Sequence, residues 1–258
     1  MIGLLKGEDN FYYQYGTLFC AAEKSLLPKN TLEELQMTKE TWVKWDLDDT
    51  VIDYGEYLEK KSDFLYNKDE DFLVVLIDIA EGGGNDYTVF QILKYLGDDK
   101  FEHVARWDAN IVDIEGAAKT LFQLFCFVFN KEHTIVSVEW NTYGALFYKW
   151  VLDFDEKLPQ YDFETSVFVT YTKIDEDLSL NSSSKKVPGL KMTANSKKSG
   201  CLLIKNDFIK HNVFTTDLKT ILEWEKFELK GNGTYSASSG HDDKVMPFVQ
   251  LPKLKESA

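Results

Sequence analysis

An uninterrupted apolar run over residues 72–77 constrains the fold of this chain more than any other feature. The run reads Phe-Leu-Val-Val-Leu-Ile and stops at Asp78. A half-exposed strand alternates apolar and polar side chains, whereas a strand buried on both faces does not. The sequence therefore predicts an α/β protein in which this strand lies inside a sheet covered by helices on both sides.

Four later segments read as further strands. Residues 86–93 and 101–107 follow the apolar run at short distance, with a turn at residues 97–99, so the first three strands form an antiparallel meander. Residues 133–138 and 166–171 are apolar segments of strand length that come later in the chain. We expect the strand at 133–138 to lie beside the first strand.

Helical segments separate the later strands. The spacing of apolar residues predicts a helix over residues 111–129, and Asn141 is placed to cap another that reaches about residue 152. A loop over 178–191, helices over 199–210 and 216–224, and a hairpin over 227–236 follow. The order βββαβαβ matches a mixed sheet flanked by helices, with an antiparallel three-strand meander plus parallel strands, as in the ribonuclease H-like group.

Composition divides the chain near residue 69. Residues 40–71 hold 11 Asp and Glu against four Lys, which is typical of a solvated linker or a wrapping segment, and their aromatic residues favour packing on the body. We expect an acidic lead-in over residues 1–68 and one ribonuclease H-like domain over 69–258. Because no apolar run reaches the ~18 residues that span a membrane, no membrane contact is expected.

The net charge of −14 argues against a nucleic-acid partner, but the charge is unevenly distributed. Residues 1–184 carry a net −19, and residues 185–258 carry a net +5. Lysines neutralise backbone phosphates without reading base sequence. Taken singly, each lysine is equally typical of a soluble surface, but their clustering favours DNA. Five lysines within fourteen residues are the candidate DNA contacts: Lys185, Lys186, Lys191, Lys197 and Lys198.

Acidic residues follow two of the predicted strands and one late turn. Asp78 ends the first strand, Glu139 ends the fourth, and Asp242 and Asp243 follow a glycine-containing turn. If the two strands are neighbours, these carboxylates meet at one sheet edge, where their mutual repulsion favours a bound metal. Hard oxygen ligands select Mg²⁺ or Mn²⁺. Any one of these acids alone is more simply a solvated strand end, but the set in this order predicts a metal site.

A glycine-rich segment, residues 81–87, joins the first two strands. Its backbone N–H groups could cradle a phosphate, although on glycine content alone a flexible hairpin turn is the better interpretation. The chain contains no Gly-Lys pair, so the phosphate-binding loop of ATPases is absent. Asp86 at the end of this segment is a candidate further metal ligand.

Three segments together resemble the nuclease motifs of the large terminase subunits of tailed bacteriophages. Residues 77–87 resemble the first motif, residues 138–144 the second, and residues 233–237 with 240–246 the third. The resemblance spans about residues 70–247. It implies a ribonuclease H-like endonuclease that cuts concatemeric double-stranded viral DNA during genome packaging.

The resemblance also implies roles for individual residues. Asp78, Glu139 and Asp243 would be the catalytic metal-binding triad for two Mg²⁺ or Mn²⁺ ions, with Asp242 and Asp86 as further ligands. His241 and Asn141 would support them, although His241 is also readable as a turn histidine that caps the next element. Implied partners are double-stranded DNA, the packaging ATPase domain or subunit, the portal and the small terminase subunit. The implied location is the host cell cytoplasm.

Two departures from the family pattern keep alternatives open. With no ATPase motif, the chain is a nuclease domain or one part of a split protein. Pro247 and Pro252 interrupt the long helix expected after Asp243, which favours a short or bent helix there. The alternatives are a junction resolvase-like nuclease, which would be a homodimer acting on branched DNA, and a non-catalytic module that binds the packaging motor through its acidic surface.

Overall fold

The computed structural model describes residues 24–44, 56–59, 67, 70–81, 84, 86–157, 167–174 and 184–255. Within these residues the main sheet has seven strands, six of them in the order β1-β2-β5-β4-β3-β6, with β9 paired to β5. Their bounds are β1 Val43–Lys44, β2 Glu56–Glu59, β3 Phe72–Asp78, β4 Thr88–Gly97, β5 Lys100–Ala109, β6 Thr134–Val138 and β9 Val213–Phe214.

The middle of the sheet has the predicted topology. Strands β3, β4 and β5 form an antiparallel meander, and β6 runs parallel to β3 on its other side. The expectation that the first and fourth predicted strands are neighbours is therefore confirmed. The carboxyl ends of β3 and β6 lie at the same edge of the sheet, with Ile77 paired to Val138.

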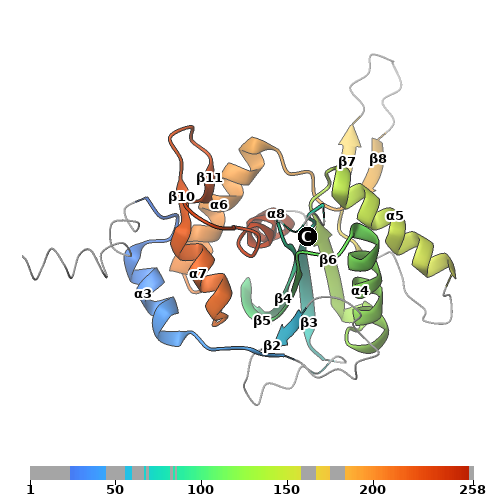
Figure 1. Ribbon diagram of the computed structural model, residues 1–258, viewed down its shortest axis with the longest axis horizontal. Helices are drawn as coiled ribbons and strands as arrows, with labels where there is room; N and C mark the ends of the chain where they lie inside the picture. Colours follow the sequence, from blue (N-terminus) through green and yellow to red (C-terminus); the bar gives the residue numbers. More distant parts are fainter. Residues whose placement is uncertain are drawn as a thin grey trace, which may run out of the picture.

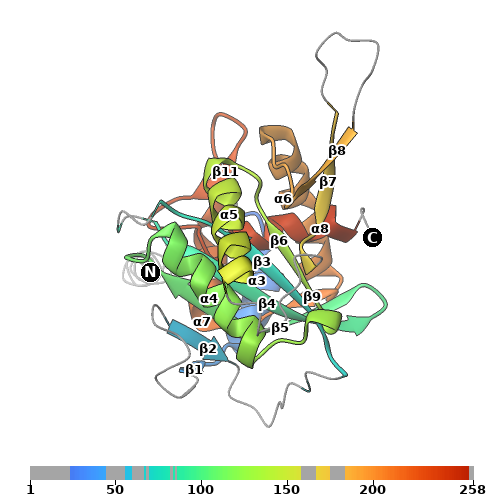
Figure 2. The same ribbon diagram turned by 90° about the vertical axis from the view of Figure 1, so that its right-hand side faces the viewer.

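Helical layers cover both faces of the sheet (Figures 1 and 2). Leu73, Val75 and Ile77 of β3 face the core under α4 (Ile114–Phe127) and α5 (Thr142–Lys157). Val74 and Leu76 face the opposite core. The elements of that second layer are α3 (Lys29–Thr38), α6 (Ala194–Ile209), α7 (Leu218–Lys226), the 3₁₀ helix η4 (Met246–Gln250) and α8 (Leu251–Lys255). Burial of both faces explains the unbroken apolar run.

The predicted strand over residues 166–171 is wrong in part. Only Phe168 bridges to β6, at Val136, and the chain then leaves the sheet. It forms β7 (Thr170–Ile174), which pairs with β8 (Ser184–Pro188) in a separate hairpin that projects from the body (Figures 1 and 2). The physical reason is that apolar residues end at Val169, so the following segment, Thr170 to Lys173, has too few apolar side chains for a place in a buried sheet.

The boundary of the lysine-rich loop also needs correction. Strand β8 lies inside the loop predicted over 178–191, and α6 begins at Ala194 instead of residue 199. Thr193 and Ser196 form a capping box. The Thr193 hydroxyl accepts from the Ser196 backbone N–H, and the Ser196 hydroxyl accepts from the Thr193 backbone N–H. Lys197 and Lys198 therefore lie on a helix and not in a loop.

The end of the chain follows the sequence prediction closely. Strands β10 (Phe227–Leu229) and β11 (Tyr235–Ala237) form the expected hairpin. Pro247 lies at the start of η4, where a missing N–H costs nothing, and Pro252 lies in the first turn of α8. The helical segment after Asp243 is therefore divided into two short pieces, as the prolines predict.

Part of the acidic lead-in belongs to the same folded body. Strand β2 pairs with β5, and Leu26 and Leu27 are buried in the core beneath α7. The backbone N–H of Leu26 donates to the carbonyl of Phe227 at 2.9 Å. The proposed domain boundary near residue 69 stays a prediction. Among the described residues, no helix has both the length and the apolar character needed to cross a bilayer.

Candidate metal centre

Asp78 and Glu139 leave the sheet side by side. Asp78 is the last residue of β3, and Glu139 directly follows β6. The residues that precede them, Ile77 and Val138, are register partners in the parallel pair. Parallel register places the two acidic residues at one edge, as the strand pattern predicted.

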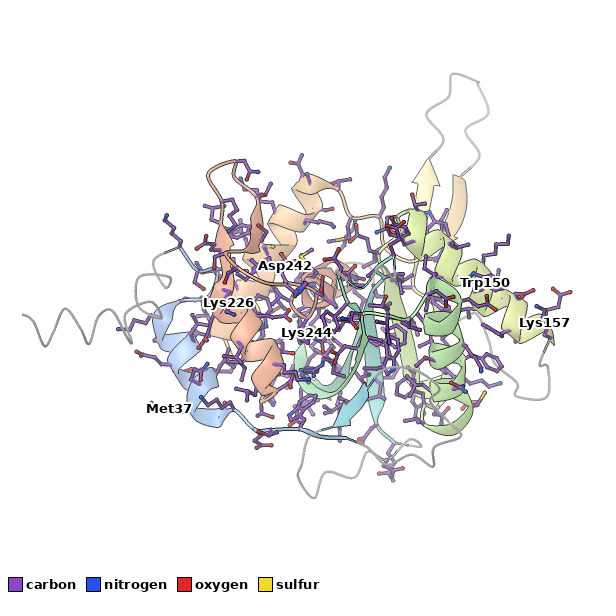
Figure 3. All side chains as sticks on the ribbon, viewed as in Figure 1. Met37, Trp150, Lys157, Lys226, Asp242 and Lys244 are labelled. Atoms are coloured by element: carbon purple, nitrogen blue, oxygen red, sulfur yellow. The ribbon has the colours of Figure 1, made fainter. Side chains whose placement is uncertain are left out.

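Asp243 reaches the same edge from the other end of the chain. Its Oδ2 accepts a hydrogen bond from the backbone N–H of Tyr87 at 2.9 Å, just before β4 begins. In the β3–β4 register, Asp78 pairs with Val89, two residues farther along. Lys244, the residue after Asp243, is held by buried Gln91, whose Nε2 donates to the Lys244 carbonyl at 2.7 Å. Figure 3 shows Asp242 and Lys244 in the middle of the molecule, between the sheet and helices α6 and α7.

Gln250 fastens the final segment to both acid-bearing strands. Its Nε2 donates to the Ile77 carbonyl at 2.8 Å, and its Oε1 accepts from the Ser137 hydroxyl at 2.8 Å. All of these groups are buried. Since buried polar groups that are fully paired hold one arrangement, Gln250 fixes η4 against β3 and β6.

The electrostatic state of Asp78 reflects the gathered carboxylates. Burial and the negative charges of Glu139, Asp243 and Asp242, against an opposing effect of Lys197, together raise the pKa of Asp78 to about 7. Burial also raises the pKa of Asp243, as do the charges of Asp86 and Asp242. Like charges at this density favour a compensating cation.

Asp243 also belongs to a group of potential metal ligands with Asp86 and His241. One ligand atom from each of Asp86, His241 and Asp243 lies within 4.8 Å of the others. His241 Nδ1 is 3.5 Å from Asp243 Oδ2 and 3.9 Å from Asp86 Oδ1. The structure thus brings His241 and Asp86 to Asp243, whereas Asp78 and Glu139 do not belong to a group of three or more ligand atoms at this spacing among the described residues.

The donor set fits a divalent cation. Carboxylate oxygens are the ligands that Mg²⁺ and Mn²⁺ prefer, and an imidazole nitrogen is compatible with Mn²⁺ and other transition metals. Burial and the neighbouring carboxylates raise the pKa of Asp78, so a positive ion at this edge would stabilise its charged form. The same carboxylates would be ionised and bridged if a dication lay among them.

Local sequence explains the rigid placement of Glu139. Asn141 caps α5, because its Oδ1 accepts from the Gly144 N–H at 2.9 Å. A Cβ on Gly144 would lie 2.0 Å from the Glu139 carbonyl oxygen, so only glycine lets the helix start this close. Gly189, with φ at +88°, approaches the Val138 carbonyl in the same way from the other side.

Asp242 has a structural partner of its own. Its Oδ2 accepts from the Ala237 N–H at 3.0 Å, which fastens the turn before Asp243 to β11. Asp242 still acts on Asp78 through its charge. The structure therefore brings Asp242 near the proposed site, with one oxygen already engaged.

Three of the five predicted DNA contacts have described side chains. Lys197 Nζ lies 2.9 Å from Glu139 Oε2 and so faces the acids. Lys198 is exposed on α6, and Lys191 is exposed in the segment before it. The side chains of Lys185 and Lys186, on β8, lie outside the described part of the chain.

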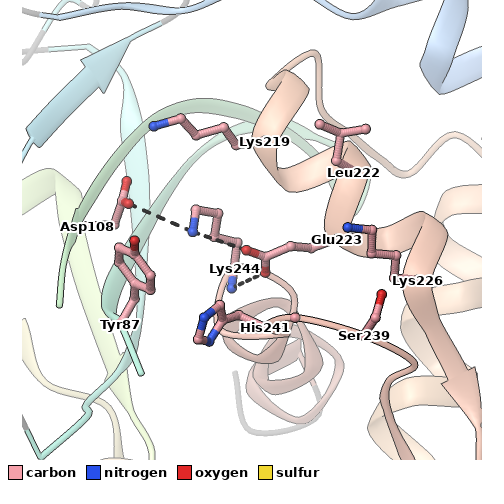
Figure 4. Close-up of a pocket in the computed structure, with 10 residues that line it drawn as sticks. Tyr87, Asp108, Lys219, Leu222, Glu223, Lys226, Ser239, His241 and Lys244 are labelled. Atoms are coloured by element: carbon pink, nitrogen blue, oxygen red, sulfur yellow. Dashed lines mark hydrogen bonds and ion pairs between the residues drawn. The ribbon is translucent and has the colours of Figure 1, made fainter. Parts of the chain in front are cut away.

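Sequence reasoning missed the groups that hold the segment after Asp243. An open pocket of about 320 Å³ adjoins His241, between β4, β5 and α7, with Lys219 and Lys226 on its lining (Figure 4). At its floor Lys244 Nζ pairs with Glu223 Oε1 of α7 at 3.1 Å, and the Lys244 N–H donates to Glu223 Oε2 at 2.7 Å. No local sequence pattern distinguishes Glu223 as the partner of Lys244.

Comparison with known proteins identifies the fold. No protein-family model matches the sequence, and no curated protein matches it either. The structure is similar to a crystal structure of the large terminase nuclease from the thermophilic phage G20c with bound cobalt. That match has a TM-score of 0.55 at 14% identity and covers 90% of this chain and 98% of that chain.

A second structural match is weaker. It is the human cytomegalovirus terminase nuclease domain, soaked with manganese and bound to an inhibitor, at a TM-score of 0.45 and 12% identity. It covers 89% of this chain and 95% of that chain. The fold assignment depends on the phage protein alone: the chain has the ribonuclease H-like fold of a terminase nuclease, as the sequence predicted.

Proposed function

We propose that this chain is a metal-dependent endonuclease domain that cuts double-stranded DNA during viral genome packaging. One observation carries the proposal. Asp78, Glu139 and Asp243 come from three separate parts of the chain and lie at one edge of a ribonuclease H-like sheet. The charges of Glu139 and Asp243 raise the pKa of Asp78 there. Structural similarity to a phage large terminase nuclease supports the same function.

In this proposal the three carboxylates hold two Mg²⁺ or Mn²⁺ ions. Such ions supply an activated water at neutral pH and stabilise charge on the scissile phosphate. Asp78 and Glu139 orient one side of the centre from rigid strand ends. Asp243 is held by the Tyr87 N–H, with Asp86 and His241 beside it. His241 is placed to exchange a proton with a phosphate oxygen or water near Asp243.

Contact with DNA is proposed for lysines on both sides of this centre. Lys191, Lys197 and Lys198 lie toward α6, and Lys219 and Lys226 lie on the pocket beside His241. With a net charge of −14, the domain alone should bind DNA weakly and lose affinity steeply as salt rises. A packaging ATPase, as domain or subunit, would supply the stronger hold on DNA in the infected cell, with the portal and small subunit as further partners.

Plasmid cleavage tests this function. Purified protein is incubated with supercoiled plasmid at low salt and a series of Mn²⁺ or Mg²⁺ concentrations, and nicked and linear products are measured. We expect cleavage by the wild type and a loss of at least about 100-fold in Asp78→Asn, because a metal ligand is removed. Asp98→Asn makes the same chemical change at an exposed turn and should cleave as the wild type does.

Two outcomes would contradict the proposal. One is no cleavage by the wild type at any metal concentration. The other is equal cleavage by Asp78→Asn, which would indicate a contaminating nuclease. A branched DNA substrate in parallel separates the proposal from a junction resolvase-like nuclease, which would cut the branched substrate in preference to the plasmid.

A further inference from the structure

We propose that the Lys197 ammonium group is an internal counter-ion of the proposed metal centre, which competes with a divalent cation for Glu139. This inference rests on the proposed function, since it concerns the same acids. This role differs from the DNA contact proposed above for the exposed lysines near it, Lys191 and Lys198.

The carrying observation is a direct ion pair inside the candidate centre. Lys197 Nζ lies 2.9 Å from Glu139 Oε2. The Glu139 side chain is only 11% exposed, whereas that of Lys197 is 38% exposed. An ion pair at this distance engages the carboxylate oxygen that a cation would need. The exposed stem of Lys197 leaves its ammonium group a path to solvent.

The charge balance around Asp78 supports the same role. Glu139, Asp243 and Asp242 all act on Asp78 with negative charge, and Lys197 is the basic side chain that acts against them. The other lysine of this region, Lys244, pairs with Glu223 at 3.1 Å and lies 3.8 Å from Asp108. Among the described residues, Lys197 is therefore positioned to offset the charge of the proposed ligands.

The fold holds Lys197 in this position through backbone contacts. Leu190 bridges to Glu139, with the Leu190 N–H donating to the Val138 carbonyl and its own carbonyl accepting from Trp140, both at 2.7 Å. The capping box at Thr193 then fixes the start of α6. Because the chain that leads to α6 is fastened to the glutamate itself, the ion pair is part of the architecture.

The helix also cannot shift easily on its other side. A Cβ on Gly200 would lie 2.5 Å from the Val249 carbonyl oxygen, so α6 packs directly on η4. The side chain of Lys197 is thus the movable part. Two consequences follow: the metal-free protein is stabilised by Lys197, and each incoming cation must displace the ammonium group from Glu139.

Metal affinity measured by calorimetry tests the inference on the full chain with Mn²⁺ alone and no DNA. Lys197→Met removes the charge and retains much of the stem volume, Lys197→Arg retains the charge, and Lys198→Met is the matched control on the next residue. We expect Lys197→Met to bind Mn²⁺ about threefold to tenfold more tightly, in line with a partly exposed ion pair and a nearby positive charge. Lys197→Arg and Lys198→Met should remain within about twofold of the wild type.

Thermal unfolding in EDTA gives a second readout. Lys197→Met should have a lower Tm than the wild type without metal and a larger rise in Tm at saturating Mn²⁺, since anything that binds only the folded state stabilises it in proportion to its affinity. In a Glu139→Gln background, Lys197→Met should change Mn²⁺ affinity less than it does in the wild-type background.

The outcomes separate this inference from the proposed function. If the wild type binds Mn²⁺ and Lys197→Met binds it equally or more weakly, the counter-ion role is overturned and the nuclease proposal stands. An equal effect of Lys197→Met with and without Glu139 would also overturn it. If neither the wild type nor Lys197→Met binds Mn²⁺, both proposals fall together.

Discussion

Asp78 differs from most aspartates because it holds its proton near neutral pH. Burial and the surrounding carboxylates together raise its pKa to about 7. In the unfolded chain an aspartate loses its proton near pH 4. The folded, metal-free protein therefore binds this proton more tightly than the unfolded chain does. A strongly raised pKa of this kind is common at functional sites.

The sign of this linkage predicts how stability depends on pH. Between about pH 4 and pH 7 the folded state holds the proton and the unfolded state does not, so this group lowers the free energy of unfolding as pH rises. Asp78→Asn cannot ionise. In EDTA at pH 8 we expect its Tm to exceed that of the wild type by roughly 4–10 °C, from on the order of 2–3 kcal/mol.

Thermal unfolding across pH checks this prediction. The advantage of Asp78→Asn should shrink below pH 7 and vanish below about pH 4, where the wild-type carboxyl is protonated in both states. Saturating Mn²⁺ should stabilise the wild type and leave the variant nearly unchanged. A variant that is less stable than the wild type in EDTA at pH 8 would contradict the electrostatic account of Asp78.

Individual residues were predictable from the sequence to different degrees. Asp78 and Glu139 follow strands, so a general rule about strand ends found them. Lys197 was grouped with the DNA contacts, because a sequence does not tell which way a lysine on a helix points. Glu223 was missed altogether, since its contact with Lys244 depends on how α7 packs and leaves no local pattern.

At the scale of elements, α7 is the part that positions the segment after Asp243. Arg106, the single arginine of the chain, is fully buried on β5. Its Nε donates to Asp108 at 2.7 Å, and its guanidinium also donates to Asp217, the residue that caps α7. Lys244 then joins α7 to the acid segment through Glu223. These buried charges align β5, α7 and Asp243 as one unit.

Removal of Arg106 should therefore destabilise the protein strongly. Arg106→Met leaves two carboxylates buried without their partner, and broken pairs of this kind cost about 3–5 kcal/mol. Urea unfolding followed by tryptophan fluorescence gives the free energy of unfolding. Lys100→Met, at the exposed start of the same strand, should change it by less than about 0.5 kcal/mol.

A loss below about 1 kcal/mol in Arg106→Met would contradict the role given to this network. It would mean that the apolar contacts of α7 suffice to hold it against β5. The test is informative because the two variants lie on one strand and differ mainly in burial.

Elements that have a clear pattern of apolar residues were predicted well. Elements that depend on pairing between distant strands were predicted less well. The meander and β6 followed from apolar runs. The departure of the segment after Val169 from the sheet was not predicted, because its partner, β8, lies in a stretch that has the composition of a loop. The predicted start of α6 is too late, although Thr193 and Ser196 carry a capping signal in the sequence.

At the scale of the whole molecule, the sheet separates two cores and exposes one edge at which chemistry is possible. Both faces of β3 are covered, and its single polar residue, Asp78, lies at its carboxyl end. The uneven charge along the sequence corresponds to a local arrangement of side chains at this edge. Negative side chains from the first three-quarters of the chain meet lysines of α6 and α7, and the total of −14 hides this local balance.

The most direct test of the account is a crystal structure of the wild-type protein soaked in Mn²⁺, with anomalous scattering recorded to locate the metal. The account predicts an anomalous peak among the carboxylates of Asp78, Glu139 and Asp243, with Lys197 Nζ displaced from Glu139. Soaked crystals of Asp78→Asn should lose or weaken that peak. A peak elsewhere, or no peak at this edge in well-ordered crystals at saturating Mn²⁺, would contradict it.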